Sequence, residues 1–205
     1  MTQEKTLGCV LLAAGSARRY GENKLLAALD GRSLILRAME AVPAEQMERV
    51  VVVTAYPEIM RLAAEFHFAA IFNEDPTLGA SHTIALGLTQ LRDLDGVMFL
   101  VCDQPLLRRE SVAALAGLWR RSPDMIAALG HHGIRGNPCV FPAPLYPELL
   151  KLTGDQGGSA VIRQHPELLT LLEVPEQELC DVDTIQTLES LQRDMSLGSQ
   201  PTQPT

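Results

Sequence analysis

The run of β-branched residues in RVVVVT, residues 49–54, constrains the fold of this chain more than any other feature. A strand with one solvent-facing side alternates apolar and polar residues, whereas a run without polar alternation is typical of a strand buried on both faces. Such strands occur in parallel sheets that helices cover on both sides. Residues 49–54 therefore predict a central strand of an α/β sheet.

Other apolar runs and amphipathic segments alternate along the chain as such a sheet requires. We expect strands at residues 9–12, 49–54, 69–72, 96–102, 124–129 and 168–174, and helices at 34–42, 58–66, 79–91, 109–121, 159–164 and 185–195. The alternation, without an internal repeat, predicts an α/β fold with a single doubly wound, mostly parallel sheet flanked by helices. Residues 130–144 contain three glycines and three prolines, which favours a shaped loop and a short strand.

Length and composition bound the class of protein. The 205 residues suit one domain, which we assign to 1–195, and the polar, proline-bearing segment 196–205 is expected to be a disordered C-terminal tail. A net charge of −8 argues against a nucleic-acid surface. Four widely spaced cysteines without a C-x-x-C motif predict buried free thiols. With no membrane-spanning run and no signal peptide, we expect a cytoplasmic protein without a membrane partner.

A cationic loop follows the first predicted strand. The small residues 13–15 let backbone N–H groups approach a ligand, and Arg18, Arg19 and Lys24 add positive charges beside them. This combination suits the phosphates of a nucleotide. The spacing matches neither the P-loop nor the dinucleotide fingerprint. The alternative is an ordinary turn between strand and helix, with arginines that are solvated surface charges.

Two aspartates are candidates for a metal site. Asp103 follows the predicted strand 96–102, at the sheet edge where ligands of open α/β folds gather, and Asp183 precedes the last predicted helix. Mg²⁺ prefers oxygen ligands and takes one or two carboxylates together with substrate phosphates. The alternatives are a turn-forming acid before Pro105 and a helix N-cap at Asp183.

Two further polar positions have a functional and a simpler interpretation. Ser81 lies at the start of the predicted helix 79–91, where free N–H groups and hydroxyls suit an anion or a sugar, and where serine is equally common as an N-cap. His131 and His132 lack the spacing of a transition-metal site, so we interpret them as part of a polar loop beside the pocket.

The first loop resembles L-A-A-G-x-S-x-R-M-G-x-x-K, the opening signature of the nucleotidyltransferases that activate molybdopterin. Later segments are similar to other motifs of this molybdenum cofactor cytidylyltransferase family: residues 79–81 (GAS), 102–105 (CDQP), 136–138 (GNP), 154–157 (GDQG) and 181–184 (DVDT). The chain departs from the family pattern at Ala17, Tyr20, Ser159, where an arginine is common, and Ile185. The resemblance implies a sheet of nucleotidyltransferase, Rossmann-like type.

The resemblance also implies roles for individual residues. The main chain of Leu12, Ala13, Ala14 and Gly15 would hold the base and sugar of the nucleotide, and Ser81 would lie near them. Arg19 and Lys24 would neutralise the triphosphate, Asp103 and Asp183 would hold Mg²⁺, and Arg19, Lys24 and Asp103 would be catalytic. Gly136, Asn137, Pro138 and Asp155 would bind the second substrate. Ala14 stands where guanylyl-transferring relatives have glycine, which favours CTP.

Together these roles imply transfer of CMP from CTP to the terminal phosphate of molybdopterin or the molybdenum cofactor, with release of pyrophosphate. The product would serve maturation of molybdenum hydroxylases, which makes an apo molybdenum hydroxylase a further partner. Two alternatives stay open. One is a nucleotidyltransferase of this fold with another base, such as GTP, or another acceptor, such as a sugar or polyol phosphate. The other is a non-catalytic carrier or chaperone of the cofactor.

Overall fold

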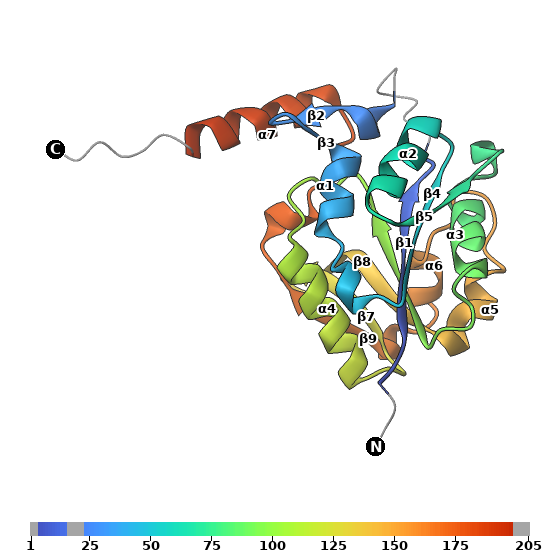
Figure 1. Ribbon diagram of the computed structural model, residues 1–205. Helices are drawn as coiled ribbons and strands as arrows, with labels where there is room; N and C mark the ends of the chain where they lie inside the picture. Colours follow the sequence, from blue (N-terminus) through green and yellow to red (C-terminus); the bar gives the residue numbers. More distant parts are fainter. Residues whose placement is uncertain (1–3, 16–22, 199–205) are drawn as a thin grey trace.

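A computed structural model of the chain describes residues 4–15 and 23–198, with side chains described up to residue 193. Its centre is a seven-stranded sheet in the order β5-β4-β1-β6-β8-β7-β9 (Figure 1). The strands are β1 (Leu7–Ala13), β4 (Arg49–Thr54), β5 (Ala69–Phe72), β6 (Gly96–Val101), β7 (Ile126–His131), β8 (Ile134–Pro142) and β9 (Leu169–Glu173). All pairs are parallel except those of β8, so the predicted mostly parallel α/β sheet is confirmed.

Residues 130–144 differ from the prediction of a loop with a short strand. Residues 134–142 form the nine-residue strand β8, antiparallel to both β6 and β7, and a tight turn at residues 132–133 joins it to β7. The pairing register of β7 with β8 shifts between Ala128 and Gly130. This irregularity accommodates the backbone of the glycine-rich segment within the sheet. Burial of Cys139, Val140 and Phe141 between two strands therefore outweighs the local preference for turns.

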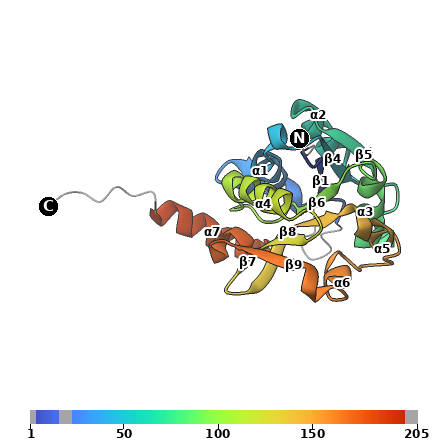
Figure 2. The ribbon, with the colours of Figure 1, turned by 90° about the horizontal axis from the view of Figure 1, so that it is seen from below.

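Helices cover both faces of the sheet (Figures 1 and 2). They are α1 (Leu34–Ala41), α2 (Pro57–Glu65), α3 (Ala80–Thr89), α4 (Arg109–Arg121), α5 (Tyr146–Leu149), α6 (Ser159–Ile162) and α7 (Ile185–Gly198). One core lies between the sheet and α1, α2 and α4, and the other lies between the sheet and α3, α5 and α6. Among the described residues, no helix has the length and apolar character needed to cross a membrane.

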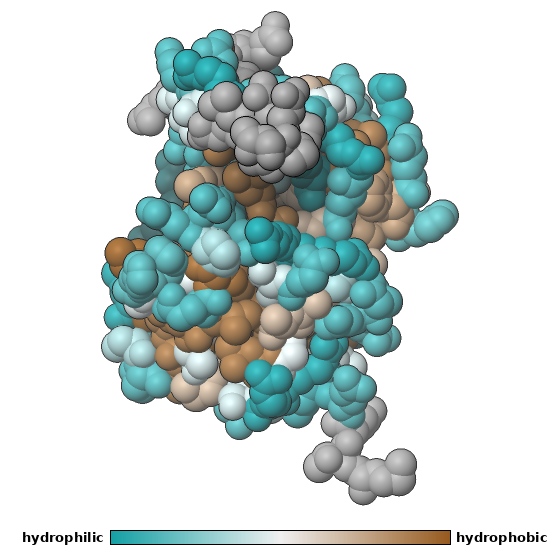
Figure 3. All heavy atoms as spheres, turned by 90° about the vertical axis from the view of Figure 1, so that its left-hand side faces the viewer, coloured by the Kyte–Doolittle hydropathy of each residue, from teal (hydrophilic) through white to brown (hydrophobic). Residues whose placement is uncertain are grey.

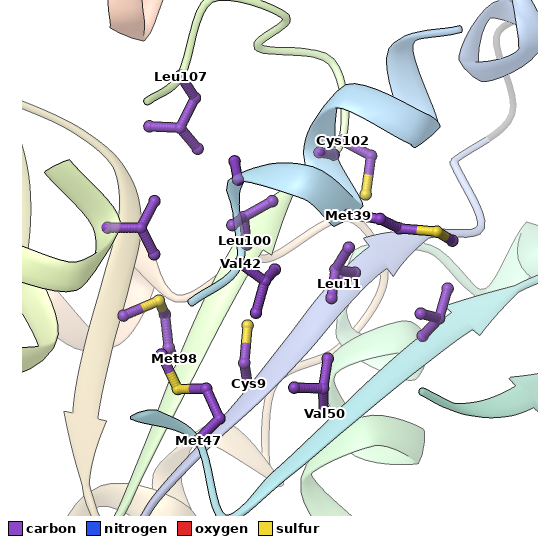
Figure 4. Close-up of a cluster of buried hydrophobic side chains, with 14 of the residues drawn as sticks. Cys9, Leu11, Met39, Val42, Met47, Val50, Met98, Leu100, Cys102 and Leu107 are labelled. Atoms are coloured by element: carbon purple, nitrogen blue, oxygen red, sulfur yellow. The ribbon is translucent and has the colours of Figure 1, made fainter. Parts of the chain in front are cut away.

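The two cores explain the uniformly apolar strands. Val50 and Val52 of β4 enter the first core, whereas Val51 and Val53 enter the second. In β1, Cys9 and Leu11 point into the first core, which Figure 4 shows, and Val10 points into the second. Because successive side chains of a strand point to opposite faces, a strand covered on both sides needs an apolar residue at every position.

Helix α7 lies beside a small hairpin and projects from the body of the protein (Figures 1 and 2). The hairpin strands are β2 (Ala28–Leu29) and β3 (Arg32–Ser33). Leu29 packs with Val182 and with α7 in a small separate core. From the side on which α7 projects, apolar side chains are visible among polar ones (Figure 3). The helix includes residues 196–198, which the sequence assigned to the tail, and residues 199–205 lie outside the described part.

Two helical glycines provide a test of how closely the layers pack. A Cβ added at Gly87 of α3 would lie 2.4 Å from Cγ1 of Val10 in β1, whereas one at Gly117 of α4 would meet only the end of Arg121, at 3.8 Å. We expect Gly87→Ala to lower the free energy of unfolding by about 1–3 kcal/mol, because the valine is stiff and central.

Gly117→Ala is the matched control. It should raise the free energy of unfolding by about 0.5–1 kcal/mol, because alanine favours the helix and finds space there. Urea unfolding of both variants measures the two effects. Equal effects of the two substitutions would contradict the tight contact of α3 with β1.

Candidate functional site

The carboxyl ends of β1 and β6 meet at one edge of the sheet. The strands are paired in parallel, with Leu12 beside Val101, so the loops that follow them start side by side. On the other side of β1, the Thr54 hydroxyl donates a hydrogen bond to the carbonyl of Ala13 (3.1 Å). This fixes the end of β1 before the small-residue corner, at the sheet edge predicted from the sequence.

A cavity of about 460 Å³ opens at this edge. Its walls come from the end of β1, from the 3₁₀ turn η3 (Pro76–Leu78), from the start of α3 and from β6. The lining residues are Leu12, Ala14, Gly15, Pro76, Thr77, Gly79, Ala80, Thr83, Val101 and Asp155. Three of the four residues predicted to hold the base and sugar, Leu12, Ala14 and Gly15, are thus in the cavity wall. Ala13 is fully buried, with its side chain in the first core.

The start of α3 is tied to the glycine-rich turn at residues 154–157. Gly79 has φ of +86°, and a Cβ there would lie 2.4 Å from the backbone of Gly154. The backbone N–H and the hydroxyl of Ser81 both donate to the carbonyl of Gly154, at 3.1 and 2.8 Å. The N-cap of α3 is Gly79, so the alternative interpretation of Ser81 as a cap is wrong. Through these two hydrogen bonds Ser81 holds the turn at residues 154–157, which contributes Asp155 to the wall of the cavity.

Lys24 joins the two candidate metal-binding aspartates. Its ammonium lies 2.9 Å from Oδ2 of Asp103 and 3.0 Å from Oδ1 of Asp183. Burial by itself lowers the pKa of Lys24, but the charges and hydrogen bonds of the two carboxylates outweigh it, so that this pKa lies above its usual value. Residues far apart in the sequence therefore form one ionic cluster, with Asp103 just after the carboxyl end of β6.

Backbone contacts hold this cluster in place. The N–H of Val182 donates to the carbonyl of Asp103 (2.8 Å), and the fully buried side chain of Val182 anchors the segment before α7. The hydroxyl of Thr184 accepts from the N–H of Thr187 (3.1 Å), which is the bond of an N-cap. Asp183 is thus one residue before the cap, and its carboxylate points to Lys24 instead.

The donor set of the cluster suits a hard divalent cation. Asp103 and Asp183 offer carboxylate oxygens on either side of Lys24, and carboxylate oxygen is the kind of ligand that Mg²⁺ or Mn²⁺ takes. Within residues 4–15 and 23–198, no group of three or more His, Cys, Asp or Glu side chains is placed to hold a metal. Two carboxylates would therefore need further oxygens from a substrate phosphate.

A second cavity has a volume of about 340 Å³ and includes Gln104, the residue that follows Asp103, in its wall. It is lined by Gln104, His131, Ile134, Arg135, Gly136, Asn137, Glu176, Leu179, Cys180 and Asp181. Gly136 and Asn137 were predicted from the sequence to bind the second substrate, whereas Pro138, joined to Asn137 by a cis peptide bond, is buried behind them. Asp155, predicted for the same role, lies in the first cavity.

Gln104, Arg135 and Asp181 line this second cavity although sequence reasoning assigned them no role. The amide of Gln104 donates to Oδ1 of Asp181 (2.9 Å) and to the carbonyl of Leu179 (3.2 Å). Partial desolvation and the charge of Asp103 raise the pKa of Asp181. Gln104 follows Asp103 directly, and Asp181 is two residues before Asp183 in the same motif. This proximity to assigned residues was the available signal.

The remaining residues singled out in the sequence are His131, His132 and Arg19. Nδ1 of His131 lies 2.9 Å from the carbonyl of Val174, and the backbone N–H of His132 donates to Glu173. His131 ends β7 at the second cavity, whereas His132 is in the turn that follows. Arg19 lies outside the described residues.

Comparison with known proteins assigns the chain to a family. The family described as the MobA-like NTP transferase domain matches residues 9–168. The chain belongs to this family. It therefore contains a nucleotidyltransferase domain, as the resemblance of its motifs implied.

This nucleotidyltransferase is similar in sequence to two relatives and in structure to one solved protein. The purine catabolism protein PucB of Bacillus subtilis is 26% identical over 200 residues, 91% of this chain and 96% of PucB. A probable molybdenum cofactor guanylyltransferase of Nostoc is 31% identical over 177 residues, 83% of each chain. The crystal structure of Rv0371c from Mycobacterium tuberculosis has a TM-score of 0.77 at 19% identity, covering 93% of this chain and 100% of Rv0371c.

The raised pKa of Lys24 leads to a prediction about stability and pH. A group whose pKa rises on folding stabilises the protein below its unfolded-state pKa, here 10.5, and this contribution is lost as pH rises through the folded-state value. We expect Lys24→Met to lower the free energy of unfolding by about 1–3 kcal/mol at neutral pH, between the values for exposed and buried pairs. The difference from wild type should shrink above pH 10.5.

Urea unfolding of both proteins over a pH series tests this expectation. Lys151→Met, at an exposed lysine without an ion-pair partner among the described residues, is the control and should differ little from wild type at any pH. A Lys24→Met difference that stays constant to about pH 11.5 would mean that the ammonium does not stabilise the cluster.

Proposed function

We propose that this nucleotidyltransferase transfers CMP from CTP to the terminal phosphate of molybdopterin or the molybdenum cofactor, for maturation of molybdenum hydroxylases. The observation that supports this best is that Asp103 stands in the chain between a residue that lines the first cavity and one that lines the second. Val101 lines the first cavity and Gln104 the second, so the short segment 101–104 reaches from one to the other. A nucleotide in the first and an acceptor in the second would both lie beside the cluster of Lys24 and Asp103.

The reaction needs alignment and charge neutralisation more than proton transfer. An oxygen of the acceptor phosphate, already anionic at neutral pH, forms a bond to the α-phosphorus of CTP. The bond from that phosphorus to the oxygen bridging to the β-phosphate breaks, and pyrophosphate leaves. The two cavities would place the reactants in line, and preorganised charge would favour the transition state.

The ionic cluster provides the charges for this step. In the structure the ammonium of Lys24 contacts both carboxylates, and a triphosphate would offer it a stronger anionic partner. Mg²⁺, when held by Asp103, Asp183 and phosphate oxygens, would neutralise charge on the α-phosphate. One crystal structure of Rv0371c, 17% identical to this chain with a TM-score of 0.72, is a complex with manganese.

The choice of CTP and of a pterin acceptor rests on the motifs. Ala14 is only 2% exposed and lines the first cavity, where a glycine would leave more room for a base. The acceptor assignment is supported by Gly136 and Asn137 in the second cavity and by the Nostoc relative named for the molybdenum cofactor. The same fold with GTP or another phosphorylated acceptor, and a cofactor carrier without activity, are the alternatives that experiment should separate.

A thermal-shift comparison of CTP, GTP, ATP and UTP, each with and without Mg²⁺, tests the nucleotide. A ligand that binds only the folded state raises the melting temperature, by about 3–6 °C at ten times its dissociation constant for a chain of this size. We expect a Mg²⁺-dependent shift with CTP alone. A shift with GTP or ATP instead would contradict the base assignment, and no shift with any nucleotide would favour the carrier.

Substitution of the cluster tests catalysis directly. We expect Lys24→Ala and Asp103→Ala each to reduce turnover at least about a hundredfold, which is the effect of losing one preorganised electrostatic contact. Pyrophosphate release in the presence of acceptor is the measurement. Lys151→Ala and Asp124→Ala are matched controls at exposed residues, with Asp124 before β7 at the opposite edge of the sheet. Near-normal turnover of folded Asp103→Ala protein would remove Asp103 from the mechanism.

A further inference from the structure

The loop after β6 and the segment before α7 are joined by hydrogen bonds along their length. The N–H of Val182 donates to the carbonyl of Asp103 (2.8 Å). Farther along the loop, the N–H of Arg108 donates to the carboxylate of Glu178 (3.1 Å), a side chain that is only 3% exposed. The two segments therefore run side by side in opposite directions, and each contributes one aspartate to the ionic cluster.

Gln104 adds a side-chain connection between the same two segments. It is 4% exposed, and its Nε2 donates to the carbonyl of Leu179 (3.2 Å) and to Oδ1 of Asp181 (2.9 Å). Both partners are acceptors on the opposite segment, which determines the orientation of the amide. Burial of an amide costs free energy that these bonds offset, whereas a methionine of similar size would fill the space without that cost. The amide therefore contributes the position of the opposite segment more than stability.

The two aspartates of the cluster depend on such a connection for their spacing. The side chain of Asp183 is 63% exposed, and within the described part of the chain its ion pair, like that of Asp103, is with Lys24 alone. In the proposed reaction a triphosphate draws the ammonium of Lys24 away from the carboxylates, which then repel each other. The bonds of Gln104 and of the Val182 N–H hold the two segments together against this repulsion.

We propose that Gln104 is a positioning residue for the divalent cation: its bonds to Leu179 and Asp181 set the spacing at which Asp103 and Asp183 reach one metal ion. This inference rests on the proposed function, in which these two carboxylates hold Mg²⁺ together with phosphate oxygens. Gln104 acts through the opposite segment and is not itself a ligand. Residues that orient metal ligands from outside contribute about ten- to a hundredfold to metal affinity.

The gain in CTP affinity that Mn²⁺ provides measures this role without any acceptor. Calorimetric titration of the full chain with CTP, once in EDTA and once in excess Mn²⁺, gives two dissociation constants whose ratio reports the contacts of the protein with the metal. Gln104→Met should reduce this ratio at least about tenfold and leave the affinity for CTP in EDTA within about twofold of wild type. Asp183→Asn, which removes a metal ligand, gives the reference for a damaged metal site.

Tyr146→Phe is the matched control for loss of a buried hydrogen bond. The hydroxyl of Tyr146, a residue that is 6% exposed, donates to the carbonyl of Leu94 (3.2 Å), which precedes the amino end of β6. This bond lies at the edge of the sheet opposite the cluster. Tyr146→Phe should lower the midpoint of urea unfolding, as Gln104→Met may be compared with it, and leave the Mn²⁺ ratio unchanged. A fall of the ratio in Tyr146→Phe as large as in Gln104→Met would overturn the proposal, because the effect would then reflect stability alone.

Variants of Asp181 separate positioning from direct binding of the metal. The side-chain oxygen of asparagine can accept the same bond from Gln104, so Asp181→Asn should keep the ratio within about threefold of wild type. A tenfold fall would overturn the proposal, because Asp181 would then act as a ligand. Asp181→Leu removes the acceptor and should reduce the ratio as Gln104→Met does, which keeps the test decisive even if Gln104→Met does not fold.

The wild-type ratio distinguishes failure of this inference from failure of the proposed function. A wild-type ratio well above that of Asp183→Asn, with no loss in Asp181→Leu or in folded Gln104→Met, would overturn the role of Gln104 and leave the metal site standing. A wild-type ratio no higher than that of Asp183→Asn would overturn the proposed metal site and this inference together.

Discussion

Burial of the central strands on both faces is the constraint on which the rest of this structure depends. β1, β4 and β6 direct alternate side chains into two separate cores, so nearly all of their positions are apolar. Polar side chains are therefore excluded from the middle of these strands and occur where the strands end. The candidate site lies at the carboxyl edge because this edge is where the backbone leaves the two cores and polar side chains become possible.

Four consecutive residues at the end of β6 and just after it occupy four different environments. Val101 contributes to the first cavity, Cys102 is buried in the core, Asp103 belongs to the ionic cluster and Gln104 faces the second cavity. A bond from Val182 to the carbonyl of Asp103 connects this segment to the start of α7. The position of the cluster thus depends on β6 and on the packing of the hairpin and α7, which come from distant parts of the chain.

Much of the fold follows from the sequence because its signals are local. The bounds of β4, β5 and α4 agree with their predicted ranges, because the apolar pattern and the flanking residues determine such elements. Ser33 caps α1 through a bond from the N–H of Leu36, the interaction expected of a serine before an apolar helix. β8 is longer than the short strand predicted there, because its glycines and prolines favour turns locally and only pairing with β6 and β7 extends the strand.

The sequence by itself determined the doubly covered sheet, the edge at which the candidate site lies and the residue types available there. Tertiary structure decided which of these residues meet. It joined Lys24 to Asp103 and Asp183, fastened Ser81 to Gly154 and placed Asp155 in the first cavity rather than beside Gly136. Within the described part of the chain, it also left Oε1 of Gln104 without a donor. Local patterns specify secondary structure and burial, whereas hydrogen bonds between distant segments depend on how the layers and loops pack.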